Sequence, residues 1–391
     1  MPSEQATWLI SVPDDSDAIG LQQNITSKLS QARATGTAVA PLKIPSLKTG
    51  TLDLLITLSE ELPKLDGSFT GIVAKIVDTL RNLLNNEPDR LAQHIRVDER
   101  TIDEYLLEGW NWNVGKYGVQ RGLRELVDIL VKEMTSIDTV MKTKLNAYNL
   151  AKGSLVQMQR KKTGNLAVRS LAEIVNKDNF IPESEYMETL MVAVPKNSTK
   201  EWETKYERLA TMVVPRSSTK IAADDDYALY SVVIFKKVHD DFAQKLRENK
   251  FILRDFTYSE TLIQKQTQEL EVAETTEREL WTELLRLSRT NFSEAFQVIV
   301  HLKVVRLFVE SVLRYGLPAE FAGLVIKPES KGTKKALSTL TDHFSYLSKR
   351  TNAKGRQGGT STTAAEDAGE YATLMEQEYL DFVLFEVPWI V

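Results

Sequence analysis

The sequence of 391 residues contains no cysteine, only four histidines and no long uncharged apolar run. The lack of cysteine excludes a disulfide framework, a thiolate metal site and a cysteine nucleophile. Its most apolar long stretch, FQVIVHLKVVRLFVESVL, is interrupted by Lys303, Arg306 and Glu310, whereas a membrane span needs roughly 18 apolar residues. The first residues show no basic region, so we expect no signal peptide. These features are typical of a cytosolic protein.

Catalytic and nucleotide-binding motifs are missing as well. Nothing in the sequence fits a P-loop, a Gly-rich dinucleotide loop after a strand, HExxH or GxSxG. The histidines (His94, His239, His301 and His343) are scattered without metal-ligand spacing. The adjacent Asp224, Asp225 and Asp226 should mostly point apart, so we interpret them as a solvated turn. We predict no catalytic residue, no metal and no cofactor, and we interpret Trp110 and Trp112 as packing anchors.

The overall charge argues against a dedicated nucleic-acid binder. The formal net charge is -5, while hydrophobic residues make up 42% and charged residues 26% of the chain. Such a composition is typical of a globular protein, and an acidic chain lacks the basic face that phosphate neutralisation needs. We therefore expect no nucleic-acid partner.

Apolar spacing predicts two very long helices. One extends from Val119 to Lys162, and the other begins at a capping box, Thr257 to Glu260, and ends at Tyr315 before Gly316. Steps of three and four residues keep one apolar seam along each helix. Both are too long for a compact core, so we expect them to pair antiparallel as a neck.

Shorter elements are predicted on either side of this neck. The expected strands are Thr7–Pro13, Glu188–Pro195, two strands around Asp224, FILRDF, FAGLVIKP and the terminal FVLFEVPWIV. AVAPLKIPSLKTG is expected to be a loop because prolines and a glycine punctuate it. A helix from Thr51 is expected to end at Pro63, before a second that Asn85 and Asn86 stop. Residues 351–370 are predicted to be low-complexity sequence, followed by an acidic helix over 371–379.

These elements predict an α+β fold with the shape of an elongated dumbbell. A small α/β head is inserted between the neck helices, and both ends of the chain form a larger foot of helices and strands. The predicted limits are foot 1–118, neck 119–162, head 163–258, neck 259–290 and foot 291–391.

The stretch QRKKTGNLAVRSL concentrates positive charge at the join of neck and head. It contains Arg160, Lys161, Lys162 and Arg169, with a break at Gly164. A phosphate-binding site is one interpretation. Cations in the last turn of a helix, followed by glycine, are more simply a helix end, and we favour that interpretation.

Four stretches carry a resemblance to a known family: KIPSLKTGTLDLLITLSEELPKLD, RKKTGNLAVRSL, ILRDFTYSE and VRLFVESVLRYGLP. In this order they resemble the C subunit of the vacuolar-type H+-ATPase, most closely its fungal members. The resemblance implies a head, a neck and a foot in a cytosolic, non-catalytic collar of the stator that resists rotary torque. It also implies release when the pump is switched off by disassembly.

The resemblance implies partners too. The head would bind a peripheral stalk, a heterodimer of the E and G subunits, while the foot would meet a second stalk and the cytosolic N-terminal domain of the a subunit. Actin is a further implied partner, and the membrane is reached only through the pump, at the cytosolic face of vacuolar and other endomembranes. The candidate partner-interface residues are Arg160, Lys161, Lys162, Arg169, Arg314 and Tyr315.

Two other functions stay open. A cytoskeletal or scaffold adaptor would use the same long helices. A nucleotide-regulated enzyme would use the small α/β domain, but its strands lack a Gly-rich phosphate loop.

Overall fold

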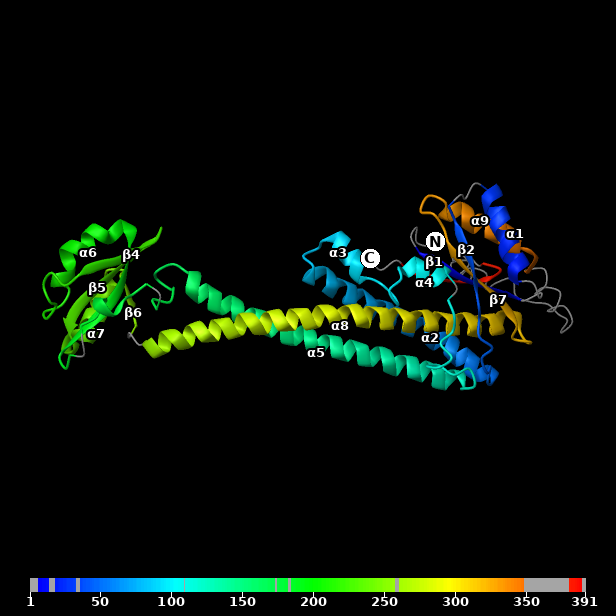
Figure 1. The fold of residues 1–391 in the computed structure, drawn as a ribbon, viewed down its shortest axis with the longest axis horizontal. Coiled ribbons are helices and arrows are strands. Elements are labelled where there is room, and N and C mark those ends of the chain that lie inside the picture. Colours follow the sequence, from blue (N-terminus) through cyan, green and yellow to red (C-terminus); the bar gives the residue numbers. More distant parts are fainter. Residues whose placement is uncertain are drawn as a thin grey trace, which may run out of the picture. The chain divides into compact units, whose positions relative to one another are not determined.

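A computed structural model describes residues 6–13, 18–32, 36–108, 110–172, 174–181, 184–256, 260–347 and 380–388. The chain divides into two compact units (Figure 1). Unit 1 comprises Met1–Lys144 and Glu283–Val391, and unit 2 comprises Leu145–Thr282. Both contain helices and a sheet, which confirms the α+β class. The dumbbell shape and the limits of head, neck and foot stay predictions. The capping box at Thr257, the low-complexity stretch and the acidic helix lie outside the described residues.

Unit 1 contains one antiparallel sheet built from both ends of the chain. Its strands are β1 (Thr7–Pro13), β2 (Ala38–Leu42), β7 (Phe321–Lys327) and β8 (Val383–Val387), in the order β2-β7-β1-β8. Its helices are α1 (Ala18–Gln31), α2 (Leu52–Leu83), α3 (Pro88–His94), α4 (Ile102–Leu107) and α9 (Thr333–Phe344), with parts of α5 (Leu123–Thr163) and α8 (Glu260–Tyr315). In the register, Ile10 lies opposite both Leu324 and Leu384. Strands β1, β7 and β8 confirm the sequence prediction.

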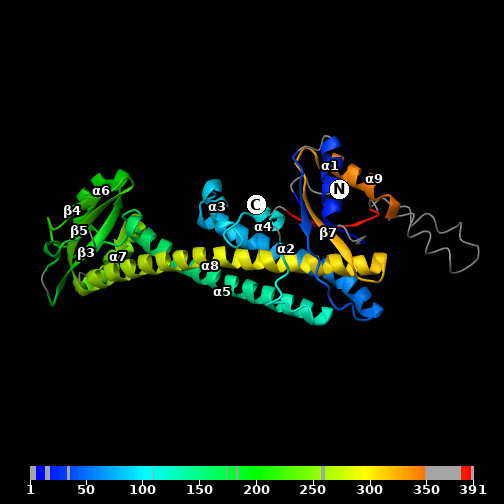
Figure 2. The ribbon, with the colours of Figure 1, turned by 45° about the vertical axis from the view of Figure 1, so that its right-hand side comes forward.

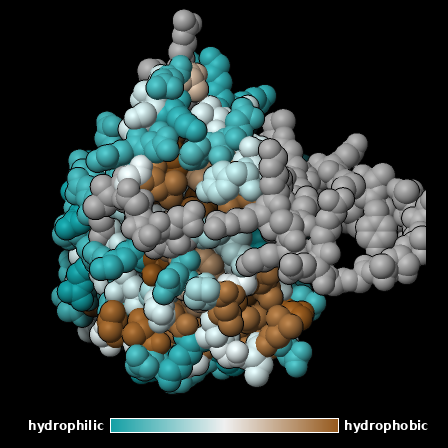
Figure 3. Space-filling model, turned by 90° about the vertical axis from the view of Figure 1, so that its right-hand side faces the viewer, coloured by the Kyte–Doolittle hydropathy of each residue, from teal (hydrophilic) through white to brown (hydrophobic). Residues whose placement is uncertain are grey.

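On the end of unit 1 that Figure 3 shows, groups of apolar side chains lie between polar ones. Large exposed apolar residues of this unit include Leu52 and Ile56 at the start of α2, and Leu317 after α8. Single exposed apolar residues are normal in soluble proteins.

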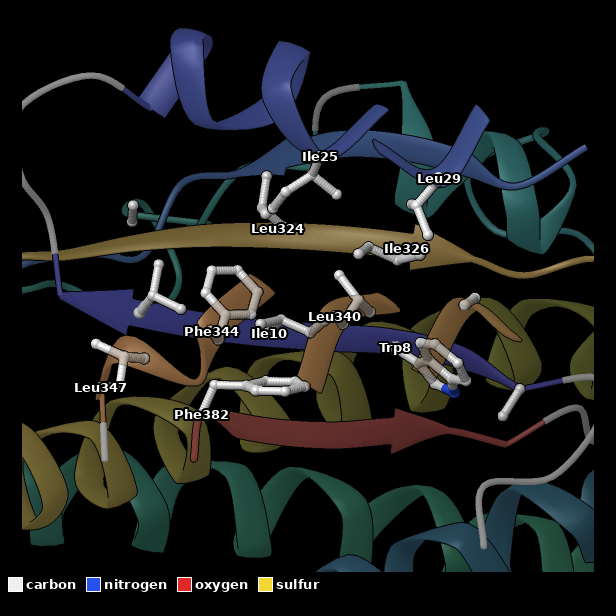
Figure 4. Packing of buried hydrophobic residues seen from close by; sticks show 14 residues of the cluster. Trp8, Ile10, Ile25, Leu29, Leu324, Ile326, Leu340, Phe344, Leu347 and Phe382 are labelled. Atoms are coloured by element: carbon white, nitrogen blue, oxygen red, sulfur yellow. The ribbon is translucent and has the colours of Figure 1, made fainter. Parts of the chain in front are cut away.

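The core of unit 1 lies between the sheet and a layer of two helices, α1 and α9, which lie side by side over one face (Figure 2). Ile25 of α1 packs near Leu324, and Phe344 of α9 packs near Ile10 (Figure 4). The other face of β1 meets α8, since the buried hydroxyl of Ser311 lies 2.8 Å from that of Ser11. The two central strands are therefore covered on both faces, which explains their continuous apolar sequence.

Strand β2 is a correction to the sequence analysis, which expected a loop there. Pro41 sits within the strand, opposite Leu324 of β7. Proline cannot donate a ladder hydrogen bond, but an edge strand has a free side that needs no donor. Because β2 is the outermost strand of the sheet, it tolerates the proline.

Helix α2 is a second correction, because it continues unbroken through Pro63. Proline removes one helical hydrogen bond, yet Pro63 is exposed while its neighbour Leu62 is completely buried. Packing of the apolar face on both sides of Pro63 outweighs that loss. The helix ends where the sequence predicted, at Asn85 and Asn86, which have φ of 54° and 61°, a conformation that asparagine tolerates.

The second part of α8 is buried nearly all round and carries two cations into the interior of unit 1. The ammonium of Lys303 lies 2.6 Å from one oxygen of Asp66, and the guanidinium of Arg306 lies 2.9 Å from the other. Burial lowers the pKa of Lys303, and Asp66 partly offsets that effect. Arg306 also stacks over Phe385 of β8, 4.1 Å from the ring centre. One carboxylate from α2 thus compensates two charges from α8.

An aromatic cluster fixes the segment before α5, as the sequence analysis expected for Trp110 and Trp112. Both are buried, and their ring centres lie 5.1 Å and 4.9 Å from that of His301 on α8. Tyr117 completes the cluster at 4.7 Å from His301. The two tryptophans are packing anchors, which confirms the prediction.

Unit 2 contains a second antiparallel sheet, in the order β4-β5-β3-β6. Its elements are β3 (Met187–Pro195), α6 (Thr199–Lys205), β4 (Thr219–Ala223), β5 (Tyr227–Phe235), α7 (His239–Glu248) and β6 (Ile252–Arg254), with parts of α5 and α8. One face is covered by α6 and α7, through Trp202 and Phe242. The other face meets Leu166 and Leu171 from the segment that follows α5. The predicted order strand, helix, two strands, helix is confirmed.

We predict that Gly323→Ala destabilises unit 1. A Cβ at Gly323 would lie 2.4 Å from the carbonyl oxygen of Leu42, so β7 would have to move away from β2. We expect a loss of about 1–3 kcal/mol in the free energy of unfolding, measured by urea denaturation. Gly71→Ala is the control, because Gly71 is exposed within α2 with nothing near its Cβ. That change should stabilise by about 0.5–1 kcal/mol, and equal effects of the two substitutions would contradict the prediction.

We predict a second, pH-dependent effect at His301. Its Nδ1–H donates to the Gln297 carbonyl at 2.7 Å, and its Nε2 accepts from the Asn113 amide at 3.2 Å. Burial lowers the pKa of His301 to about 4. Because the unfolded chain binds this proton near pH 6.5, stability is full above that pH and falls towards pH 4, by about 3 kcal/mol. His301→Gln removes the titration, so its unfolding free energy should depend less steeply on pH over this window. Identical pH profiles for the two proteins would refute the assignment.

Candidate partner-binding surface

The basic stretch singled out in the sequence is the end of α5 and the segment after it. Arg160, Lys161 and Lys162 lie in the last turn of α5, which ends at Thr163, and the side chains of Arg160 and Lys162 are exposed. This confirms the helix end. Cations are favourable there because the C-terminus of a helix carries partial negative charge. Gly164 does not take the positive φ of a typical glycine cap. A Cβ added at Gly164 would lie 3.0 Å from the carbonyl oxygen of Arg160, so glycine allows the backbone to approach that oxygen closely.

The charges of the two helical segments in unit 2 have opposite sign. From Leu145 to Thr163, α5 carries Lys152, Arg160, Lys161 and Lys162 and no carboxylate. From Glu260 to Thr282, α8 carries Glu260, Glu269, Glu271, Glu274, Glu277 and Glu279 against Lys265 and Arg278. The segments meet at Tyr148, whose pKa is raised by burial and by the neighbouring Glu277. They therefore form a two-helix stem in which the segment from α5 is basic and the segment from α8 is acidic.

The segment after α5 is fixed by one carboxylate. Asp224, in the turn between β4 and β5, accepts hydrogen bonds from the backbone amides of Leu166 at 2.6 Å, Tyr227 at 2.6 Å and Asp226 at 2.9 Å. Burial alone would raise the pKa of Asp224, but these three amides outweigh it and lower the pKa. Asp224 is thus a structural residue rather than part of a solvated turn, and that interpretation was wrong for it.

Arg254 of β6 fixes the same segment from another side. Its guanidinium donates to the carbonyl oxygens of Ala167 and Arg169, and burial lowers its pKa. Below them Leu166 and Leu171 are buried against the sheet. The backbone is therefore held while Val168, which is 67% exposed, and the half-buried Arg169 remain at the surface.

Arg314 and Tyr315, the other two predicted interface residues, lie in unit 1 and bind their own chain. Arg314 donates to the carbonyl oxygens of Leu380 at 2.8 Å and Phe382 at 3.0 Å. The hydroxyl of Tyr315 donates to the Ser11 carbonyl and accepts from the amide that begins β8, both at 3.0 Å. These contacts join the end of α8 to β1 and β8. Both residues therefore have a structural role, and their role in binding a partner stays a prediction.

Two described histidines each contact a charged side chain of another element. Among the described residues, no group of three or more His, Asp or Glu side chains is placed to hold a metal ion. His239 pairs with Glu188 at 2.7 Å, and His343 contacts Lys28 at 2.7 Å. Within the described parts of the chain, no helix is long and apolar enough to cross a membrane.

Comparison with known proteins agrees with the resemblance seen in the sequence. The model of the family described as the C subunit of V-ATPase matches residues 7–383. The C 1 subunit of V-type proton ATPase from Rattus norvegicus is 38% identical over 386 residues, and that from Xenopus tropicalis is 37% identical over 380; each match covers 97% of both chains. The C 1-A subunit of Danio rerio is 36% identical over 382 residues, with the same coverage. The cytoplasmic N-terminal domain of the I subunit, homolog of the a subunit, of V-ATPase covers 85% of this chain and 97% of its own, but at a TM-score of 0.28 and 12% identity it carries no argument.

We predict that Asp224→Ala loosens the segment after α5. The amides of Leu166 and Tyr227 lose their acceptor, so their hydrogen exchange should speed up about tenfold, as loss of about 1.4 kcal/mol of protection implies. Hydrogen exchange read by NMR measures this directly. Asp225→Ala, at the exposed neighbouring position, is the control and should leave both rates unchanged. Undiminished protection at Leu166 in Asp224→Ala would show that the carboxylate does not hold the segment.

Proposed function

The chain belongs to the family of V-ATPase C subunits, and we propose that it is a non-catalytic stator subunit of the V-type proton ATPase. The observation that carries the proposal is the family match over residues 7–383, which runs through both units. In this role the chain takes part in ATP-driven proton transport without turning over ATP itself. It would act at the cytosolic face of the membrane that holds the pump.

The proposed partners are the peripheral stalks, each a heterodimer of the E and G subunits, and the cytosolic N-terminal domain of the a subunit. The stem of unit 2 supports such contacts, because α8 exposes most of its side chains from Gln264 to Thr276. A helix with so little burial is typical of one that docks other helices. The basic end of α5 would orient an acidic stretch of a stalk on unit 2.

Resistance to torque and reversible assembly are the mechanical part of the proposal. Both α5 and α8 contribute residues to both units, so each helix is a continuous covalent connection between them. Release during disassembly is easier when contacts are divided among several modest, partly polar surfaces than when one large apolar interface must open. The charged segments of the stem fit this requirement.

A cytoskeletal adaptor that binds actin is the second candidate function. It is supported by the same exposed helical surface, which suits docking on other proteins. Co-purification separates the two functions: a stator subunit is recovered with other pump subunits, whereas an adaptor is recovered with filaments alone.

We predict that the full chain binds a recombinant E–G heterodimer and that Lys161→Glu with Lys162→Glu weakens the complex about tenfold or more. Reversing two charges at the basic end of α5 replaces attraction for an acidic stretch by repulsion. Isothermal titration calorimetry measures the dissociation constant.

The control carries the same change of charge elsewhere in unit 2. Lys200→Glu with Arg247→Glu alters exposed cations on α6 and α7, which cover the opposite face of the sheet from the segment after α5. This variant should bind like the unaltered chain. If the unaltered chain does not bind the heterodimer, the stator proposal fails; if both variants bind normally, only the role of the basic end fails.

A further inference from the structure

Strand β8 and the residues just before it are held by the rest of unit 1 through their backbone. The strand pairs with β1 alone. Arg314 donates to the carbonyl oxygens of Leu380 at 2.8 Å and Phe382 at 3.0 Å, and the hydroxyl of Tyr315 accepts from the amide of Val383 at 3.0 Å. Recognition of main-chain groups beside the edge of a strand is one of the ways in which proteins bind extended peptides.

Two phenylalanines of this segment make contacts on opposite faces of the sheet, as side chains three residues apart on a strand do. Phe382 lies in the core, with its ring centre 5.1 Å from that of Phe344 on α9 (Figure 4). Arg306 of α8 stacks over Phe385, 4.1 Å from its ring centre. The segment is therefore held by two specific aromatic contacts as well as by its main chain.

Burial concentrates apolar contact area in this short segment. Phe382, Val383 and Val387 are 1%, 3% and 2% exposed. Burial of such side chains contributes about 1.5–3 kcal/mol each, and the ladder with β1 adds hydrogen bonds along the strand. The contacts described here involve only residues 380–387 and their partners.

The partners of the segment all precede residue 348 in the chain. We call β1 together with the side chains of Arg306, Arg314, Tyr315 and Phe344 the β1 edge site. Residues 348–379 join the segment to the rest of the chain, and these 32 residues can span at most about 110 Å. A connection of that length does not by itself fix where or in which direction the strand lies. The contacts at the β1 edge site therefore determine its place.

We propose that residues 380–387 act as an intramolecular peptide ligand and that the β1 edge site is a strand-binding site. The site takes an extended segment with phenylalanines three residues apart and aliphatic residues between them. Tethering supplies the chain's own segment at an effective concentration on the order of millimolar. The same segment of a second copy therefore replaces it only near that protein concentration or when the tether is cut. The proposal does not depend on the proposed function in the pump.

The first test cuts the tether in the full chain. A site for a sequence-specific protease replaces residues 355–361, and the cut chain is titrated with a fluorescent synthetic peptide of residues 380–388. We expect saturable binding to the cut chain under native conditions, read by fluorescence anisotropy. Binding to the uncut chain should be at least tenfold weaker, because the tethered strand competes.

Three outcomes of this test would overturn the proposal. The peptide could fail to enter the cut chain, which would show that the strand is not separable. It could bind the cut and uncut chains equally, which would place it outside the β1 edge site. Unit 1 could also unfold on cutting, as followed by circular dichroism, which would make the strand an integral part of the core.

Variants of the peptide test whether the site selects the two aromatic side chains. Phe382→Ala removes the contact in the core and Phe385→Ala removes the contact with Arg306, so each peptide should bind at least tenfold more weakly. Asp381→Asn is the control, because it changes neither aromatic position, and its affinity should stay within about twofold. Equal affinities of all these peptides would show that binding is not specific and would refute the site.

The second test leaves the chain uncut and asks whether β8 opens by itself. Arg314→Gln removes the donor to the carbonyls before β8, so the amides of β8 should exchange hydrogen at least tenfold faster while those of β7 keep their rates. Arg286→Gln alters an exposed cation on the same helix and should change neither strand. Equal acceleration of β7 and β8 in Arg314→Gln would mean that β8 opens only with the whole sheet, which contradicts the proposal.

Discussion

The burial of two cations on one helix is the constraint on which unit 1 depends. The second part of α8 is apolar nearly all round, so it must be enclosed on every side. Lys303 and Arg306 enter this interior with it, and an unpaired buried charge costs several kcal/mol. Asp66 meets both. The carboxylate lies three residues beyond Pro63 on α2, so a break at the proline would separate the charge from its partners. The continuity of α2 is therefore an electrostatic requirement as well as a packing preference.

The same helix places the C-terminal strand. Arg306 stacks on Phe385, and two turns further along α8 the guanidinium of Arg314 donates to carbonyls just before β8. Tyr315 then receives the first amide of β8. Strand β8 lies at the edge of the sheet and is hydrogen-bonded to β1 alone. The polar contacts with α8 therefore hold β8 in place in addition to its hydrogen bonds with β1. The charged residues that interrupt the apolar run of α8 thus connect this helix to the C-terminal strand.

Sequence patterns predicted the long elements of this fold and missed the features that depend on context. The helix that ends at Tyr315 and the strand Thr7–Pro13 were predictable because burial imposes a clear period or a continuous apolar run. Strand β2 was missed because proline is read as a breaker unless the strand is known to be an edge. The predicted helix end at Pro63 was wrong for a related reason. The hydrogen bond that proline removes is a local loss, whereas the burial that offsets it involves residues distant in sequence.

The candidate contact surfaces were harder to predict than the core because exposed residues follow no period. The basic end of α5 could be recognised from the cluster of cations in the sequence. The side chains that fix the following segment, Asp224 and Arg254, could not. Asp224 looks like its two neighbours in the sequence, and only the fold directs three amides at it. Its place in a short turn between two strands is the signal that could have found it, because aspartate commonly accepts backbone hydrogen bonds there. The framework of this fold therefore follows from patterns that the sequence displays, whereas the contacts of single turn and surface residues arise only when the chain folds.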